Sequence, residues 1–229
     1  MKQVLYLFYI LNFTLFYHSS WSQDWANLDK YKEENVTIMS KMKDKPTAVF
    51  MGNSITEGWV SIRPQFFEKH DFIGRGISGQ TTPQMLVRFR QDVIDLSPKA
   101  VVILAGTNDI AGNTGPMTLA MITDNIKSMA ELAEANGIKV ILCSVLPAYD
   151  YPWRPGLKPN EKIPALNKLI KAYCSEKGFV YLDYFTAMAD ERNGLPKKYA
   201  EDEVHPTIEG YKVMEPLVVE AVKKALQEK

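Results

Sequence analysis

The 229-residue sequence is poor in the side chains that build metal centres and disulfide frameworks, because it has only two cysteines and three histidines. Only His70 and His205 lie outside residues 1–22, a segment expected to be removed, so a multi-histidine site is excluded by count, although a carboxylate site for Mg²⁺ or Ca²⁺ is not. Cys143 and Cys174 each lie in a segment where a small apolar residue would be buried. We therefore expect two buried thiols, with a bridge between them as the alternative.

The sequence also lacks an excess of charge of either sign, since 27 Lys and Arg residues balance 27 Asp and Glu residues. This balance argues against a nucleic-acid binder or a protein attracted to anionic membranes. No Ser/Gly/Pro-rich tract, long charge run or internal repeat interrupts the chain. With 46% hydrophobic residues, we expect one domain over residues 23–229.

The long uncharged stretch near the N-terminus, residues 4–17, has 14 residues. A bilayer-spanning helix needs about 20 apolar residues. Small residues follow at Ser20 and Ser22, so we expect a signal peptide over residues 1–22, cleaved near Gln23. An uncleaved N-terminal anchor is the alternative. Because no cysteine lies near the cut, a lipid anchor is not expected. The mature protein is then expected to be secreted or periplasmic, without stable membrane insertion.

After a polar, helix-like lead-in, short runs of Val, Ile, Phe and Leu alternate with segments of helical periodicity. Continuous apolar runs are typical of strands buried on both faces of a parallel sheet. The alternation predicts an α/β sandwich with a mostly parallel, five-stranded sheet. The strands are expected at residues 47–51, 71–77, 100–106, 139–146 and 179–185, the lead-in at 24–44, and the other helices at 82–96, 118–137, 160–178 and about 207–227.

Glycine and small polar residues follow the first three expected strands, at 52–54, 76–82 and 106–109. Because ligands of such sheets bind at the carboxyl ends of the strands, these segments are expected to share one site. The segment "DEVHP", residues 202–206, precedes the last helix and could reach the same edge.

The residue types in these segments suit nucleophilic catalysis. A serine hydroxyl such as that of Ser54 needs a base, and His205 suits that role near neutral pH. Asp202 lies three residues before His205, close enough to hold the imidazole ring. The alternative is structural, because Ser54 and Glu57 form the S-x-x-E pattern of a helix capping box. One serine could do both.

An acyl-transfer reaction also needs donors for the oxyanion of its tetrahedral intermediate. The backbone amides of Ser54 and Gly79 and the side-chain amide of Asn108 are the candidates. Losing one such donor typically lowers the rate by about 10²–10³, so a dedicated asparagine is reasonable. A site of this kind needs no metal or other cofactor.

The sequence resembles the SGNH or GDSL hydrolases over residues 47–206. The matching segments, in order, are Gly52-Asn53-Ser54-Ile55, Gly79 in "GISGQTT", Gly106-Thr107-Asn108-Asp109 and Asp202-x-x-His205.

This resemblance implies a flavodoxin-like, three-layer fold whose parallel sheet has the strand order 2-1-3-4-5, with helices on both faces. It also implies ester hydrolysis through an acyl-serine. One position departs from the family pattern, because Asn53 stands where the family usually has aspartate.

Two further patterns support competing functions. Residues 74–79, "GRGISG", match the dinucleotide fingerprint G-x-G-x-x-G, but the next strand ends without an acid to hold a ribose. Asp109, Asp202 and His205 could alternatively form a metallohydrolase site. A non-catalytic binding protein on the same fold is a third alternative, and Asn53 is its only support.

The segment that follows the fourth expected strand, residues 148–162, is expected to overhang the site. Tyr149, Tyr151, Trp153 and Arg154 could stack on sugar rings or line an acyl groove, and Asn53 could face the substrate too. These residues could equally stiffen the loop. By resemblance we expect a small-molecule or carbohydrate ester as substrate, with short O-acyl (acetyl) groups. A lysophospholipase or thioesterase is the alternative.

Overall fold

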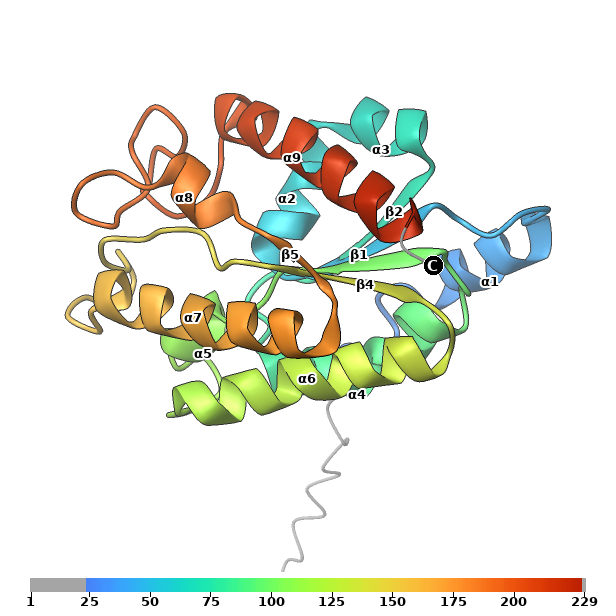
Figure 1. Cartoon of the computed structure of the whole chain (residues 1–229), viewed down its shortest axis with the longest axis horizontal. Coiled ribbons are helices and arrows are strands. Elements are labelled where there is room, and N and C mark those ends of the chain that lie inside the picture. The colour runs from blue at the N-terminus through green and yellow to red at the C-terminus, as the bar shows by residue number, and fades with distance from the viewer. Residues whose placement is uncertain (1–23, 228–229) are drawn as a thin grey trace, which may run out of the picture.

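A computed structural model describes residues 24–227, so the expected signal peptide lies outside the described residues. The chain forms one five-stranded sheet with helices on both faces, and every strand pair is parallel (Figure 1). The strand order is β2-β1-β3-β4-β5, which confirms the expected α/β fold and the implied order. The strands are β1 (Ala48–Gly52), β2 (Phe72–Gly76), β3 (Ala100–Ile103), β4 (Lys139–Cys143) and β5 (Val180–Leu182).

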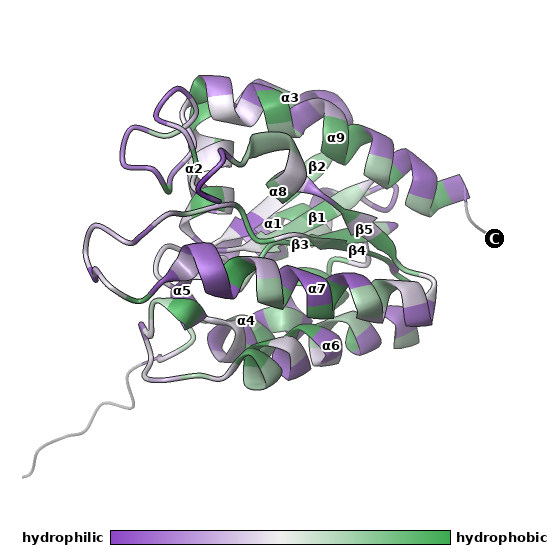
Figure 2. Ribbon diagram, turned by 60° about the vertical axis from the view of Figure 1, so that its left-hand side comes forward, coloured by the Kyte–Doolittle hydropathy of each residue, from purple (hydrophilic) through white to green (hydrophobic). Residues whose placement is uncertain are grey.

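Each central strand is buried on both faces, so its side chains alternate between two cores. Ala48 and Phe50 of β1 enter one core, whereas Val49 and Met51 enter the other. Figure 2 shows the hydrophobic strands between helices that carry both hydrophilic and hydrophobic residues. This burial explains why the strands read as unbroken apolar runs in the sequence.

The helices form two layers, one on each face of the sheet (Figure 1). One layer contains α2 (Ser54–Ile62), α3 (Pro64–His70), α8 (Tyr184–Met188) and α9 (Ile208–Gln227). The other contains α4 (Thr82–Phe89), the π-helix η1 (Arg90–Ile94), α5 (Thr107–Ile110), α6 (Leu119–Ala135) and α7 (Pro159–Lys177).

The N-terminal segment is helical over a shorter range than expected, because only α1 (Lys32–Lys41) forms within residues 24–44. The residues before α1 instead bond to the protein surface. Gln80 donates to the Ala26 carbonyl at 2.7 Å, and Gln91 donates to the Leu28 carbonyl at 2.6 Å. The segment is therefore tied to the loop after β2 and to η1.

The two cysteines are free thiols, both buried. Cys143 belongs to the core that contains α9, whereas Cys174 belongs to the core on the other face of the sheet. Burial raises the pKa of both thiols. Within residues 24–227, no helix is long and apolar enough to cross a membrane.

Candidate active site

Ser54 is the first residue of α2 and directly follows the turn that leaves β1. The turn is tight, because a side chain at Gly52 would collide with Thr56. Asn53 caps the helix, and its Oδ1 accepts a long, 3.5 Å hydrogen bond from the amide of Ile55. The Ser54 Oγ is thereby left free of the helix, and it lies 3.0 Å from the Nε2 atom of His205.

The alternative in which Ser54 and Glu57 form a capping box is wrong. The cap is Asn53, one residue earlier, and the Glu57 side chain accepts from Ser78 and Lys30 instead of from the helix start. Serine is a common cap, but the neighbouring asparagine is an equally good one. The sequence pattern could not tell which residue would take that position.

His205 is held by Asp202 on the side of the ring away from Ser54. The Asp202 Oδ2 lies 2.6 Å from the His205 Nδ1, while Oδ1 accepts from the backbone amides of His205 at 2.7 Å and Val204 at 3.0 Å. Partial burial raises the pKa of Asp202, but these hydrogen bonds outweigh it and hold the pKa below its usual value. The carboxylate therefore stays ionised beside the ring near neutral pH.

The loop that carries Asp202 and His205 is closed by contacts at its base. The amide of Thr207 donates to the Tyr199 carbonyl at 2.7 Å. A side chain at Gly210 would lie 2.5 Å from that same carbonyl oxygen, so the loop and α9 pack tightly here. Ser54 and His205, 151 positions apart, meet because α2 and the start of α9 lie on the same face of the sheet.

The three expected oxyanion donors lie at the ends of β1, β2 and β3. Ser54 begins α2, so its amide has no partner within the helix. Gly79 is exposed with φ +77°, a conformation that disfavours other residues. The Asn108 Nδ2 donates one hydrogen to the Gln80 carbonyl at 3.0 Å, which orients the amide and leaves its second hydrogen for a ligand.

The ends of β1 and β2 are joined by Arg88, whose side chain is fully buried. Its Nη2 donates to the carbonyls of Gly52 and Arg75, both at 2.9 Å, and its Nε donates to Gln80 at 2.5 Å. Asp92, 2.8 Å from Nη1, balances its charge. Arg88 was not among the residues predicted from the sequence, although its spacing of four from Asp92 within an otherwise apolar helix face was a usable signal.

Asp109 is directed away from the metal site that it could have formed with Asp202 and His205. Its Oδ1 accepts from the amide of Thr82 at 2.9 Å and from the Thr82 hydroxyl at 2.6 Å. Burial raises the pKa of this carboxyl above its usual value. Among residues 24–227, no group of three or more His, Cys, Asp or Glu side chains is placed to hold a metal ion.

Two of the three glycines in the dinucleotide-like pattern serve helix packing. Gly74 and Gly76 lie within β2, where a side chain would collide with Val60 and with the backbone of α2. They let α2, the helix that begins at Ser54, lie close against β2. The structure thus explains these two glycines without a nucleotide.

Trp153, in the loop after β4, lies beside His205. Its ring centroid lies 6.0 Å from that of His205, and 47% of the residue is exposed. The ring stacks on Tyr151 at 5.1 Å. Tyr151 is fully buried and hydrogen-bonds to Thr107 at 2.9 Å, so it supports Trp153 and does not face a ligand.

The other two candidates in this loop have separate surroundings. Arg154 donates to the carbonyls of Ala111 and Gly112 at 2.6 and 2.7 Å, which ties the loop to the segment after β3. Tyr149 is 44% exposed, with the guanidinium of Arg192 4.7 Å from its ring centroid. Arg154 therefore holds the loop in place, while the Tyr149 ring remains partly exposed to solvent.

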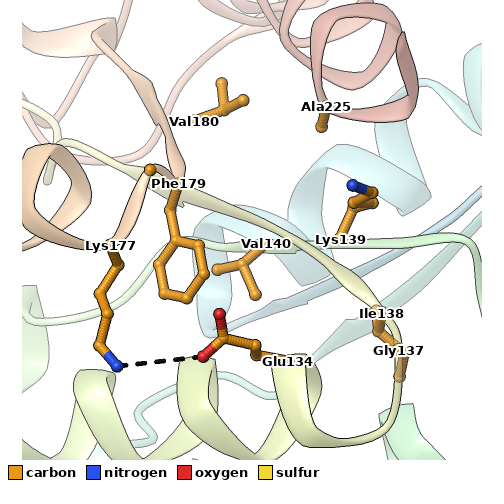
Figure 3. Close-up of a pocket in the computed structure, with 10 residues that line it drawn as sticks. Glu134, Gly137, Ile138, Lys139, Val140, Lys177, Phe179, Val180 and Ala225 are labelled. Atoms are coloured by element: carbon orange, nitrogen blue, oxygen red, sulfur yellow. Dashed lines mark ion pairs between the residues drawn. The ribbon is translucent and has the colours of Figure 1, made fainter. Parts of the chain in front are cut away.

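A groove of about 490 Å³ lies at the amino ends of β4 and β5, at the other end of the sheet from Ser54 (Figure 3). Phe179 and Val140 line it, and Lys177 and Glu134 face each other there at 4.0 Å. It contains no nucleophile paired with a base. The Ser54–His205 pair lies instead at the carboxyl ends of the strands, the edge where ligands of such sheets bind.

The family model of the GDSL-like lipases and acylhydrolases matches residues 50–213, which include all the segments described above. The chain belongs to this family. Membership of a lipase and acylhydrolase family, together with the esterase relatives below, identifies the chain as a carboxylic ester hydrolase. A GDSL-like lipase from Bacteroides thetaiotaomicron is 50% identical, with a TM-score of 0.84, over 88% of this chain and 99% of that one. A Bacteroides fragilis structure is 49% identical, with a TM-score of 0.85, over 89% of this chain and 99% of that one.

Curated relatives are more distant. An acetylxylan esterase of Xylanibacter ruminicola is 25% identical over 90% of this chain and 48% of its own length. Esterase TesA of Pseudomonas aeruginosa is 26% identical over 76% of this chain and 86% of its own length. An uncharacterized lipoprotein of Bacillus subtilis is matched over 33% of its length. The chain thus spans less than half the length of two of these relatives.

Position 53 has asparagine where the family usually has aspartate, and we expect the protein to tolerate aspartate there. Asn53→Asp should remain active, because both residues cap helices well. The added charge near the active site favours the protonated imidazole of His205, so the acid limb of kcat/KM should move to higher pH. The measurement is the pH profile with a soluble acetyl ester. A folded but inactive variant, or a limb that moves to lower pH, would contradict this account.

Proposed function

We propose that this protein is a serine esterase that hydrolyses carboxylic esters through an acyl-Ser54 intermediate. The observation that carries the proposal is the continuous hydrogen-bonded path from the Ser54 Oγ to the His205 Nε2 at 3.0 Å and from the His205 Nδ1 to Asp202 at 2.6 Å. A nucleophile, a base and an acceptor for the base are thus in contact, which is the minimum arrangement for activating serine.

In the proposed reaction the Ser54 Oγ attacks the ester carbonyl carbon while His205 Nε2 accepts the hydroxyl proton. The amides of Ser54 and Gly79 and the Asn108 side chain stabilise the resulting oxyanion. His205 then donates the proton to the departing alkoxide, releasing an alcohol and leaving acyl-Ser54. A water molecule, deprotonated by His205, attacks the acyl-enzyme, and His205 returns that proton to the Ser54 Oγ as the carboxylic acid is released.

For the substrate, we propose short acyl groups, such as acetyl, carried on a carbohydrate. The exposed face of Trp153 beside His205 supports this, because a flat aromatic ring at the site can stack on a sugar ring. A relative at 25% identity is an acetylxylan esterase. A longer acyl group would need a broad apolar surface, whereas the exposed aromatic ring found beside His205 is the single ring of Trp153.

The proposed location is outside the cytoplasm, either secreted or periplasmic. This proposal rests on the first 22 residues, whose uncharged stretch and small residues have the pattern of a cleaved signal. N-terminal sequencing of the protein recovered from the producing cells tests it. A mature chain that begins near Gln23 is expected, and retention of Met1 or Lys2 would contradict the cleavage.

The experiment that tests the substrate is a panel of p-nitrophenyl esters from acetate to palmitate, run beside acetylated xylan and a lysophospholipid. We expect turnover to fall as the acyl chain lengthens and acetate to be released from the polysaccharide. A preference for palmitate, or hydrolysis of the lysophospholipid without acetate release from xylan, would favour the lysophospholipase or thioesterase alternative.

Trp153→Ala should weaken the binding of a carbohydrate ester more than that of a small synthetic ester. We expect the KM for acetylated xylo-oligosaccharides to rise about two- to tenfold, the range of one aromatic contact, with p-nitrophenyl acetate kinetics little changed. The control is Trp25→Ala, which removes a tryptophan of similar exposure, 51%, from the N-terminal segment. An unchanged KM for the oligosaccharide would remove Trp153 from the substrate site.

A further inference from the structure

The loop that carries the Gly79 amide is held from outside the sheet by Glu57. The Glu57 Oε2 accepts from the Ser78 amide at 2.8 Å and also from the Ser78 hydroxyl. Ser78 immediately precedes Gly79, so these bonds act on the residue next to the candidate oxyanion donor. Ser78 and Gly79 form the tip of this loop, and neither is buried. A side chain at Gly79 would meet nothing within 4 Å. Packing therefore does little to position the tip.

Glu57 is well placed to control that position, because it lies one helical turn after Ser54 on α2. One short helix thus carries both the nucleophile and the anchor of the facing loop. On the far side of the tip, the Asn113 side chain donates to the Gly79 carbonyl at 3.0 Å. The Ser78 amide and the Gly79 carbonyl are thus both hydrogen-bonded, so the peptide that contains the Gly79 amide lies between two fixed groups.

The Glu57 carboxylate is itself fixed by Lys30, whose Nζ lies 2.9 Å from Oε1. Partial burial raises the pKa of Glu57, but hydrogen bonds from Ser78 and Lys30 outweigh it and hold the pKa below its usual value. Each oxygen of the carboxylate therefore has its own partner. Lys30 belongs to the segment before α1, at the start of the expected mature chain. That segment therefore helps to hold Glu57 against Ser78.

We propose that Glu57 is a positioning residue that sets the Gly79 amide against the oxyanion formed during reaction at Ser54, with Lys30 as its counter-charge. The inference rests on the proposed function. An oxyanion donor acts most strongly when the carbonyl oxygen becomes negative, so a displaced donor weakens transition-state binding more than substrate binding. Loss of Glu57 should therefore appear in kcat and not in KM.

The experiment compares wild type with Glu57→Ala, Glu57→Gln and Ser78→Ala, using p-nitrophenyl acetate. We expect Glu57→Ala to lower kcat about 10- to 100-fold, less than complete removal of a donor, with KM within about threefold. Glu57→Gln should be intermediate, because its amide oxygen can still accept from Ser78. Ser78→Ala keeps the backbone amide and should lose no more than about threefold.

A second readout separates positioning from general destabilisation. The inhibition constant of an alkyl boronic acid, which forms a tetrahedral adduct with serine, should rise across the series in proportion to the fall in kcat/KM. The matched control is Glu209→Ala. Glu209 lies in the first turn of α9 and pairs with Lys212 at 2.7 Å, and it does not bond to the loop that carries Ser78 and Gly79. This control should change Tm slightly and kcat by less than about twofold.

Two results would overturn the inference: a folded Glu57→Ala whose kcat is within twofold of wild type, or a loss of kcat that Glu209→Ala reproduces. The proposed function fails separately, if the wild-type protein hydrolyses no ester or if Ser54→Ala stays active. An inactive Ser54→Ala beside a normal Glu57→Ala would reject the positioning role alone.

Discussion

Ser54→Ala should abolish ester hydrolysis and leave the fold intact. The Ser54 hydroxyl lies 3.0 Å from His205 and does not cap α2, a role taken by Asn53. Its removal therefore deletes the nucleophile without costing the helix a hydrogen bond. In a serine hydrolase of unrelated fold, loss of the nucleophilic serine lowers kcat by about 10⁶, so we expect activity near the background rate.

The measurement is initial-rate hydrolysis of p-nitrophenyl acetate by purified protein, with Tm and circular dichroism as checks of folding. Ser61→Ala is the matched control, because Ser61 lies on the same helix and its hydroxyl donates only to the Glu57 carbonyl. This control should retain full activity. Activity of Ser54→Ala within a few-fold of wild type would eliminate the acyl-serine mechanism and favour a binding protein or another hydrolytic site.

Asp202→Asn should lower kcat by about 10³–10⁴ with a much smaller change in KM. The amides of Val204 and His205 both donate to one oxygen of Asp202, so asparagine is expected to keep its oxygen there. Its NH₂ group then faces the His205 Nδ1 and forces that nitrogen to accept. The ring proton moves to Nε2, which can no longer take the proton of Ser54. In an unrelated serine hydrolase the equivalent change costs about 10⁴ in kcat.

Steady-state kinetics at several pH values would measure this effect. Asp183→Asn serves as the control, because Asp183 caps α8 by accepting from the amide of Thr186, and asparagine caps a helix equally well. Its kcat should match wild type. An Asp202→Asn variant with unchanged kcat would show that Asp202 is a surface carboxylate with no effect on the tautomer of His205.

Much of the architecture could be predicted from the sequence, because local patterns carried it. The apolar runs identified all five strands, and the central runs are unbroken because a strand covered on both faces has no polar side. Their ends pointed to Ser54, Gly79 and Asn108 as neighbours, because parallel strands present their carboxyl ends at one edge. Asp202 was placed beside His205 by a spacing of three residues within a single loop.

Boundaries within the helices were less predictable, because competing local interactions have similar energies. The expected lead-in helix is helical only in its second half, where Lys32 begins α1, since the preceding residues bond to Gln80 and Gln91. The pattern at 82–96 is divided between α4 and the π-helix η1 that begins at Arg90. A periodicity of apolar residues does not specify which backbone hydrogen bonds continue the helix.

Local patterns in the sequence were enough to predict the layered sheet, the edge at which its polar residues lie and the candidate serine, histidine and aspartate. The folded structure alone revealed the partners of side chains whose neighbours are distant in the chain. It brought Ser54 within reach of His205, joined Glu57 to Ser78, and placed Trp153 beside the imidazole ring. These contacts depend on how whole helices and loops pack across the sheet, and no local propensity or spacing encodes that packing.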